Sequence, residues 1–188
     1  SVPTSILLPQ TLDAVDVPVV AAGGMFDGRG LAAALSYGAA GIAMGTRFLL
    51  TEESPVHRNA LNRYLETRDP SMIKISTAVD GLSQRFIEND ELRRIEDMGR
   101  AARLSMAMKH AVKWGRENNL GMIGMARMGL KTFTSDPKSF AQTVLAPNLL
   151  AMVSRGIGQG DPDGGPLASG QAAAMIGELE SVEALITR

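Results

Sequence analysis

Two short segments, one strand–helix–strand unit apart, are the residues of this sequence best suited to chemistry. Ala22-Gly23-Gly24 follows one short apolar run, and Ala43-Met44-Gly45-Thr46 ends the next. Glycine lets the backbone approach an anion closely and adopt positive φ, and a threonine hydroxyl adds a hydrogen-bond donor. The pattern therefore indicates a phosphate site made largely of backbone N–H groups. The structural alternative is that both segments serve only as tight turns.

The elements around these segments predict one parallel βαβ unit. Residues 17–22 and 40–44 are short, apolar and not alternating, which is typical of strands buried on both faces. Between them, Asp27 can cap a helix over 28–37, and Gly38 is suited to end it. In a parallel barrel, the loops after neighbouring strands lie side by side at the C-terminal face, where phosphate sites are common.

The rest of the chain is predicted to be mainly helical. The expected helices are 5–15, 54–66, 90–118 with an interruption at Gly99 or Gly115, 135–155 with a break at Pro147, and a short pair after residue 170. Residues 72–79 fit a strand or an extended segment, and 121–130 favour no element. Residues 156–170 hold six glycines and two prolines and predict a loop. Two parallel strands cannot close a barrel, so the sheet needs further strands from elsewhere.

Residues 17–54 closely resemble the nitronate monooxygenase (2-nitropropane dioxygenase) family, and flavin-type enoyl-acyl-carrier-protein reductases share the same signature. The stretch reads VPVVAAGGMFDGRGLAAALSYGAAGIAMGTRFLLTEES. Weaker resemblance continues at His57, at Arg85 and Asn89, and at 168–177 (ASGQAAAMIG), which looks like the family's closing segment near the flavin. The resemblance implies a TIM-like (β/α) barrel that binds FMN noncovalently.

Carried over by position, the resemblance implies a set of residues that hold the FMN phosphate through backbone amides and one hydroxyl. The set is Gly23, Gly24, Ala43, Met44, Gly45 and Thr46. Position 43 is often glutamine in the family, and because the backbone does much of the binding we expect alanine to be tolerated. The implied fold class is α/β: the C-terminal portion of a TIM-like barrel with an added mainly helical region. Residues 1–54 would form its C-terminal βα units, 55–167 a helical covering region, and 168–188 the closing helical segment.

No catalytic residue is nominated in this chain. Family members carry a glycine-rich flavin-contacting stretch and a histidine in a Gly-Gly-His-type loop, both upstream of the part that this sequence resembles. That histidine handles the substrate proton. His57 stands at a helix start and His110 lies within a helix, and neither occurs in that motif. We therefore expect an N-terminal barrel half to supply the catalytic residue.

Three functions follow as hypotheses. The first is an FMN-dependent oxidoreductase of the monooxygenase type, which oxidises an alkyl nitronate with O₂. The alternative is an FMN-dependent reductase or dehydrogenase that acts on a CoA or acyl-carrier thioester with NAD(P)H. The second alternative is a non-catalytic phosphate-binding fragment. The phosphate motif is common to the first two and cannot separate them.

The amino-acid composition excludes several kinds of binding site and partner. The 188 residues are 45% apolar, and a formal charge of −1 gives no overall basic footprint for nucleic acid, although local basic clusters remain open. There is no cysteine and there are only two histidines, so thiolate chemistry is excluded and a multi-histidine metal site is not expected. No apolar run approaches the roughly 18 residues of a membrane span, and no signal peptide opens the sequence. We expect a soluble cytoplasmic protein, without a membrane partner, for which self-association into a homo-oligomer stays open.

Overall fold

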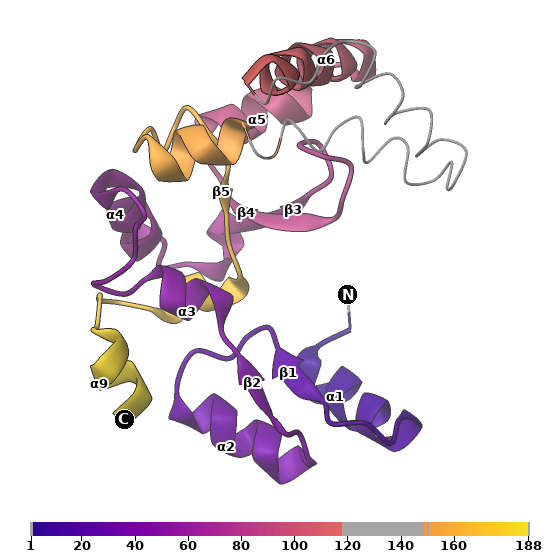
Figure 1. Cartoon of the computed structure of the whole chain (residues 1–188), viewed down its shortest axis with the longest axis vertical. Coiled ribbons are helices and arrows are strands. Elements are labelled where there is room, and N and C mark those ends of the chain that lie inside the picture. Colours follow the sequence, from indigo (N-terminus) through magenta and orange to yellow (C-terminus); the bar gives the residue numbers. More distant parts are fainter. Residues whose placement is uncertain (1, 118–148, 150, 188) are drawn as a thin grey trace. The chain divides into compact units, whose positions relative to one another are not determined.

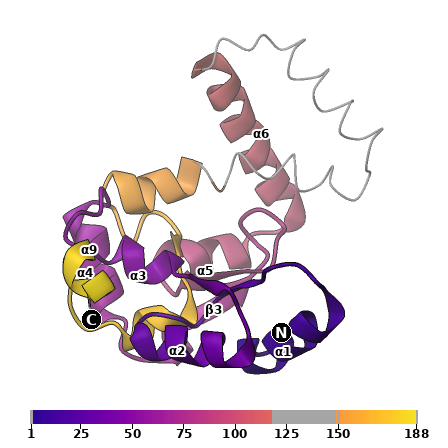
Figure 2. The ribbon, with the colours of Figure 1, turned by 60° about the horizontal axis from the view of Figure 1, so that its bottom comes forward.

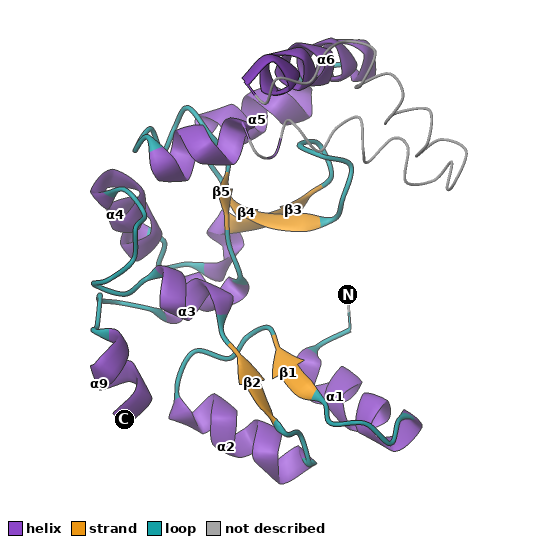
Figure 3. Cartoon of the chain, viewed as in Figure 1, coloured by secondary structure: helices purple, strands orange, loops and turns teal. Residues whose placement is uncertain are grey.

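The computed structural model describes residues 2–117, 149 and 151–187 (Figure 1). Helices and short strands alternate along them, as expected of an α/β protein (Figure 3). They form two compact units, Ser1–Ile73 with Ser169–Arg188, and Lys74–Ala168. In this division residues 55–73 group with the first unit.

The first unit contains the predicted βαβ arrangement near its start. Its elements are α1 (Thr4–Ala14), β1 (Val20–Ala22), α2 (Gly28–Tyr37), β2 (Gly41–Ala43), α3 (Gly45–Leu49), α4 (Arg58–Glu66), the 3₁₀ turns η1 (Pro70–Met72) and η3 (Gln171–Met175), and α9 (Val182–Thr187). β1 and β2 pair in parallel, with Val20 opposite Gly41 and Ala22 opposite Ala43. The Asp27 carboxylate caps α2, and Gly38 ends it with φ 102°, which confirms both predicted ends of this helix.

The burial of these strands differs from the prediction. The core of this part of the chain consists of Leu8, Ala21, Ala34 and Ala39, with Leu12, Val19, Met25 and Ile42 packed against them. In β1 only Ala21 is buried, whereas Val20 is 56% exposed. Among the described residues the sheet has two strands, and α1 and α2 contact it. The expectation of burial on both faces is therefore wrong for the chain by itself, because no further strand or helix of the described residues covers Val20.

The second unit contains a small sheet that the sequence did not predict in full. Its elements are β3 (Ile73–Ser76, which begins at the boundary), β4 (Gln84–Ile87), α5 (Asp90–Asp97), α6 (Arg100–Glu117), the π-helical turn η2 (Ser154–Gly158) and β5 (Leu167–Ala168). The strands follow the order β3-β4-β5, and β4 and β5 are antiparallel. The core consists of Ala78, Val79, Phe86, Leu92, Ile95 and Met152. Within the described ranges, no helix is both long and apolar enough to cross a membrane.

A buried asparagine explains how a glycine-rich segment can pair as a strand. The Nδ2 of Asn89 donates to the carbonyls of Pro162 at 2.7 Å and Gly165 at 2.8 Å, while its Oδ1 accepts from Leu92 N and caps α5. The predicted loop over 156–170 is thus partly wrong, since it contains the end of η2 and β5. β5 pairs with Phe86 and Ile87 of β4, and the segment before it is held by Asn89. These partners lie more than 70 positions away along the chain, so the local composition of 156–170 does not indicate them.

The helix boundaries agree with the sequence in part. The helix expected over 90–118 is divided at Gly99, because α5 ends at Asp97 and α6 begins at Arg100. The helix expected from residue 54 begins instead at Arg58, because the Nδ1 of His57 accepts from the N–H of Asn59 at 3.2 Å and caps it. The predictions for 121–130 and for most of 135–155 lie outside the described residues.

We predict that the isolated chain does not behave as a stable monomer. Large apolar side chains of the first unit are exposed, among them Val17 at 65%, Val20 at 56% and Leu35 at 50%. An open two-stranded parallel sheet also leaves unpaired backbone groups on its edges, which favours association with other chains. Sedimentation velocity and thermal unfolding of the isolated chain should show self-association and no single cooperative transition. A cooperatively melting monomer would contradict this prediction.

Candidate functional site

The carboxyl ends of β1 and β2 lie side by side. Because Ala22 is opposite Ala43, the chain leaves both strands at the same edge, into the loop at Gly23 and the loop at Met44. Gly23 and Gly24 have φ values of 99° and 78°, a conformation that residues with a Cβ rarely adopt. The parallel register therefore brings the two predicted phosphate segments together at one edge of the sheet.

The space next to these loops is open. A Cβ placed on Gly24 or on Gly45 would meet no other atom within 4 Å. On its other side, the loop is held by the Thr4 hydroxyl, which donates to the carbonyl of Gly23 at 3.1 Å. A ligand can thus approach the backbone of both segments closely, as a phosphate site made from main-chain groups requires.

The closing segment contacts the second loop through Thr46 (α3) and Gly170. The backbone N–H of Gly170 donates to Thr46 Oγ1 at 2.9 Å. A Cβ on Gly170 would stand 2.9 Å from that same oxygen, so the contact requires glycine. Since the hydroxyl oxygen accepts from Gly170, its hydrogen is directed elsewhere and can be donated to a ligand.

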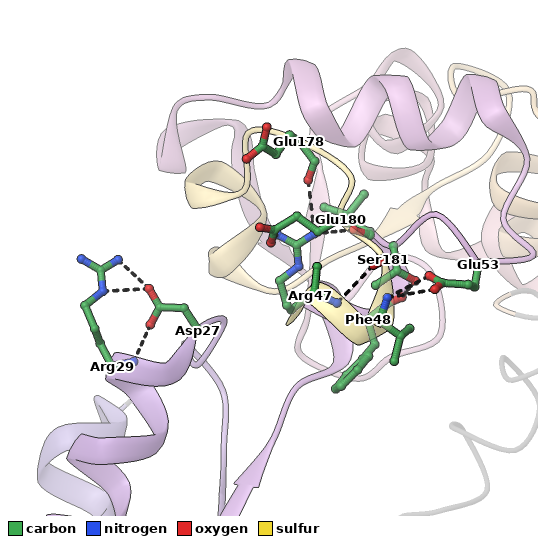
Figure 4. A network of polar contacts seen from close by, with 12 residues as sticks. Asp27, Arg29, Arg47, Phe48, Glu53, Glu178, Glu180 and Ser181 are labelled. Atoms are coloured by element: carbon green, nitrogen blue, oxygen red, sulfur yellow. Dashed lines mark hydrogen bonds and ion pairs between the residues drawn. The ribbon is translucent and has the colours of Figure 1, made fainter. Parts of the chain in front are cut away.

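The charged residues nearest in sequence to the first loop already have a structural role. The Asp27 carboxylate accepts from the backbone N–H groups of Arg29 and Gly30 at 3.0 and 3.3 Å, and from the Arg29 guanidinium at 2.5 and 2.8 Å (Figure 4). The Arg29 side-chain hydrogen bond, together with the charge of Arg29 and the backbone donors, holds the pKa of Asp27 below its usual value. Asp27 is thus an ionised helix cap, and most of the Arg29 side chain is in solvent.

A buried arginine directly follows the phosphate segment. Arg47 is 4% exposed, and its Nη2 donates to the carbonyls of Leu50 at 2.5 Å and Glu178 at 3.2 Å. Its Nη1 lies 3.4 Å from a carboxylate oxygen of Glu180 (Figure 4). One guanidinium therefore joins α3 to the last residues of the chain, immediately beside Thr46.

The same terminal residues run along the segment after α3. Thr51 and Glu180 form a parallel bridge, and the N–H of Glu52 donates to the Glu180 carbonyl at 3.1 Å. The two carboxylate oxygens of Glu53 accept from the N–H of Val182, at 2.9 and 3.1 Å. Together with Arg47 and Gly170, these contacts fix the closing segment against the second loop.

The structure brings together the six residues that the sequence singled out, at one edge, with Thr46 next to the closing segment. His57 caps α4 of the first unit, and His110 lies on α6 of the second unit. No group of acidic or histidine residues in the described part of the chain could hold a metal ion. Sequence reasoning missed Arg47 and the Gly170 contact, although a single charge in the run GTRFLL was a signal.

Glycine-lined edges of parallel βαβ units are common places for nucleotide phosphates in α/β proteins. A profile described as nitronate monooxygenase matches residues 2–188. The chain belongs to the nitronate monooxygenase family. Proteins of this family, and their structural neighbours, are TIM-barrel oxidoreductases. No closed barrel forms within the described residues.

Individual relatives carry several enzyme names. A (3aS,4S,5R,7aS)-5-hydroxy-7a-methyl-1-oxo-octahydro-1H-indene-4-carboxyl-CoA dehydrogenase of Rhodococcus jostii is 40% identical over 98% of this chain and 52% of its own length. A probable nitronate monooxygenase of Staphylococcus haemolyticus is 42% identical over 46% of this chain and 24% of its own. The structure of FabK from Thermotoga maritima matches all of this chain and 47% of its own with a TM-score of 0.66 and 24% identity. The chain spans about half the length of the relatives that it matches most fully.

We predict that Arg47 stabilises the first unit far more than Arg29 does. Arg47→Met leaves the buried carbonyl of Leu50, the partly buried carbonyl of Glu178 and the Glu180 carboxylate without their donor, and losses of this kind cost about 2–4 kcal/mol. Arg29→Met is the matched control, because it breaks only an exposed ion pair, which contributes little. In the full protein, which includes the expected N-terminal barrel half, urea unfolding should show a lower midpoint for Arg47→Met and an unchanged one for Arg29→Met. Equal midpoints for the two variants would contradict the role given to Arg47.

Proposed function

We propose that this chain supplies the C-terminal portion of a TIM-like barrel, and that its two glycine loops hold the phosphate of FMN. The observation that carries the proposal is the shared edge of β1 and β2, where glycines of positive φ and an open backbone stand beside Thr46. Residues 1–54 form the βα units in this proposal, and 168–188 close the site. The remaining strands come from an N-terminal barrel half.

The residues at this edge suit a phosphate. Gly23, Gly24, Ala43, Met44 and Gly45 would offer backbone groups, and the Thr46 hydroxyl would donate a hydrogen bond. Alanine at position 43 is compatible with this role, since a backbone donor does not depend on its side chain. No arginine or lysine is among these six residues, so the site would rely on oriented N–H groups more than on a full positive charge.

We predict that Gly170→Ala weakens the binding of FMN but not of riboflavin, which lacks the phosphate. The added methyl group would displace the Thr46 hydroxyl, and the loss of one good phosphate contact costs about tenfold in affinity. Thr46→Val, which removes the hydroxyl, should weaken FMN binding by a similar factor. Thr46→Ser, which keeps the hydroxyl, should bind FMN as tightly as the wild-type protein does. Fluorescence titration of the flavin-free protein with each flavin measures this.

The control for this prediction is Gly177→Ala in the same closing segment. A Cβ there would meet only the mobile end of Arg68, so FMN affinity should not change. If Gly170→Ala weakened riboflavin binding as much as FMN binding, the contact would be general packing and not phosphate recognition.

We further propose that the substrate is a CoA thioester. The relative that matches along nearly the whole chain is named as a CoA-thioester dehydrogenase, whereas the nitronate monooxygenase relative matches less than half of it. In such a reaction the acyl group exchanges two electrons and two protons with the enzyme, and a nicotinamide takes up or supplies the hydride. FMN, when bound, supplies two-electron redox chemistry between them. This chain would hold its phosphate, while the group that moves the substrate proton would lie on the N-terminal half.

Nitronate oxidation, the first function expected from the sequence, is the second candidate here, and the family profile over residues 2–188 supports it. We predict that the purified protein has a visible flavin spectrum and releases free FMN on denaturation. It should turn over an acyl-CoA substrate in a nicotinamide- or dye-coupled assay faster than it consumes O₂ with propionate 3-nitronate. The opposite preference would favour the second candidate. A protein that neither contains nor takes up FMN would overturn both.

A further inference from the structure

Helix α6 carries a concentration of positive charge that the site above does not use. Its sequence, RAARLSMAMKHAVKWGRE, has five lysine and arginine residues and one acidic residue, although the whole chain has a formal charge of −1. The helix is drawn as one continuous element in Figure 2. A charge of this density on one element favours an anionic ligand.

Three of these cations share one face of the helix. Lys109, Lys113 and Arg116 follow at spacings of four and three residues, which aligns them on an α-helix, and all three are exposed. With Met108 and Val112 they line a hollow of about 490 Å³, to which Ser105 also contributes. The face thus combines the charged groups of lysine and arginine with the apolar side chains of Met108 and Val112.

The spacing within this cationic face is unfavourable for the helix itself. Lys109 and Lys113 are like charges four residues apart, which repel each other. The residues three and four positions from Lys109 are Ser105, Met106, Val112 and Lys113, so no acid of its own helix can pair with it. An anion bound beside Lys109 would supply the countercharge that the neighbouring turns of its own helix lack.

We propose that this face of α6 binds the phosphorylated end of coenzyme A. The inference rests on the proposed function, in which the substrate is a CoA thioester. That end of CoA carries a 3′-phosphate and a diphosphate on adenosine, and lysine and arginine donors are suited to bind them. Adenine and the methyl groups of the pantetheine arm can pack on Met108 and Val112, which makes the face complementary in both charge and polarity.

The test compares two thioesters of the same acyl group in the flavin-loaded protein, one with CoA and one with N-acetylcysteamine, which has no phosphate. Lys109→Gln and Arg116→Gln should each raise KM for the CoA thioester about tenfold, as expected for the loss of one charge-assisted contact. The N-acetylcysteamine thioester should be turned over as before. Arg103→Gln is the matched control, because it removes one cation from the same helix outside the hollow.

Binding measurements separate the possible sources of the anion. Adenosine 3′,5′-bisphosphate should bind the wild-type protein in calorimetry and compete with the CoA thioester, and Lys109→Gln with Arg116→Gln should abolish this. Preference for adenosine 2′,5′-bisphosphate would mark a nicotinamide phosphate site and overturn the proposal. Competition only by phosphatidylserine vesicles would mark a membrane-contacting face and also overturn it.

The proposed substrate class and the proposed α6 binding site can be rejected separately. If the wild-type protein turns over neither thioester, the proposed substrate class is wrong, and a lack of calorimetric binding would then reject the α6 site independently. If both thioesters are used and the α6 variants affect them equally, or affect neither, the substrate class stands and the assignment of this face is wrong.

Discussion

The arrangement of the first unit depends on the buried guanidinium of Arg47. Burying an arginine is costly unless its donors are satisfied and its charge is paired. Here the carbonyls of Leu50 and Glu178 accept from its Nη2, and the Glu180 carboxylate lies beside its Nη1. Since Glu178 and Glu180 are far along the chain from α3, satisfying Arg47 also brings the closing segment to the phosphate loop. Without that segment, Thr46 would lack the Gly170 contact that orients its hydroxyl.

A site made of backbone groups has consequences for how a family diversifies. The strand register and the positive φ of Gly23 and Gly24 set the positions of the N–H groups, and a backbone N–H at position 43 does not depend on the side chain there. Relatives named as CoA dehydrogenase, nitronate monooxygenase and FabK are all similar to this chain. A phosphate site made of backbone groups would not by itself distinguish between substrates, so other residues would have to select them.

The second unit offers candidates for that selection. Its core is held by Asn89, which joins the start of α5 to the glycine-rich segment 162–165. In the same unit, the α6 residues Lys109, Lys113 and Arg116 form an exposed cationic face. A substrate with a phosphorylated carrier has an anionic group far from its reactive carbon, and such remote binding energy can be used to position the reacting group.

The sequence by itself determined the βαβ unit, its caps at Asp27 and Gly38, and the family. These depend on local signals: apolar runs, a capping carboxylate, and glycines where φ must be positive. Only the tertiary structure decided the roles of Arg47, Gly170 and Asn89, whose partners lie some 75 to 130 residues away. Hydrogen bonds across such separations leave no periodic pattern in a sequence. The strand β5 was missed for the same reason, since a segment of two residues forms a strand only when a partner, here the distant β4, supplies its hydrogen bonds.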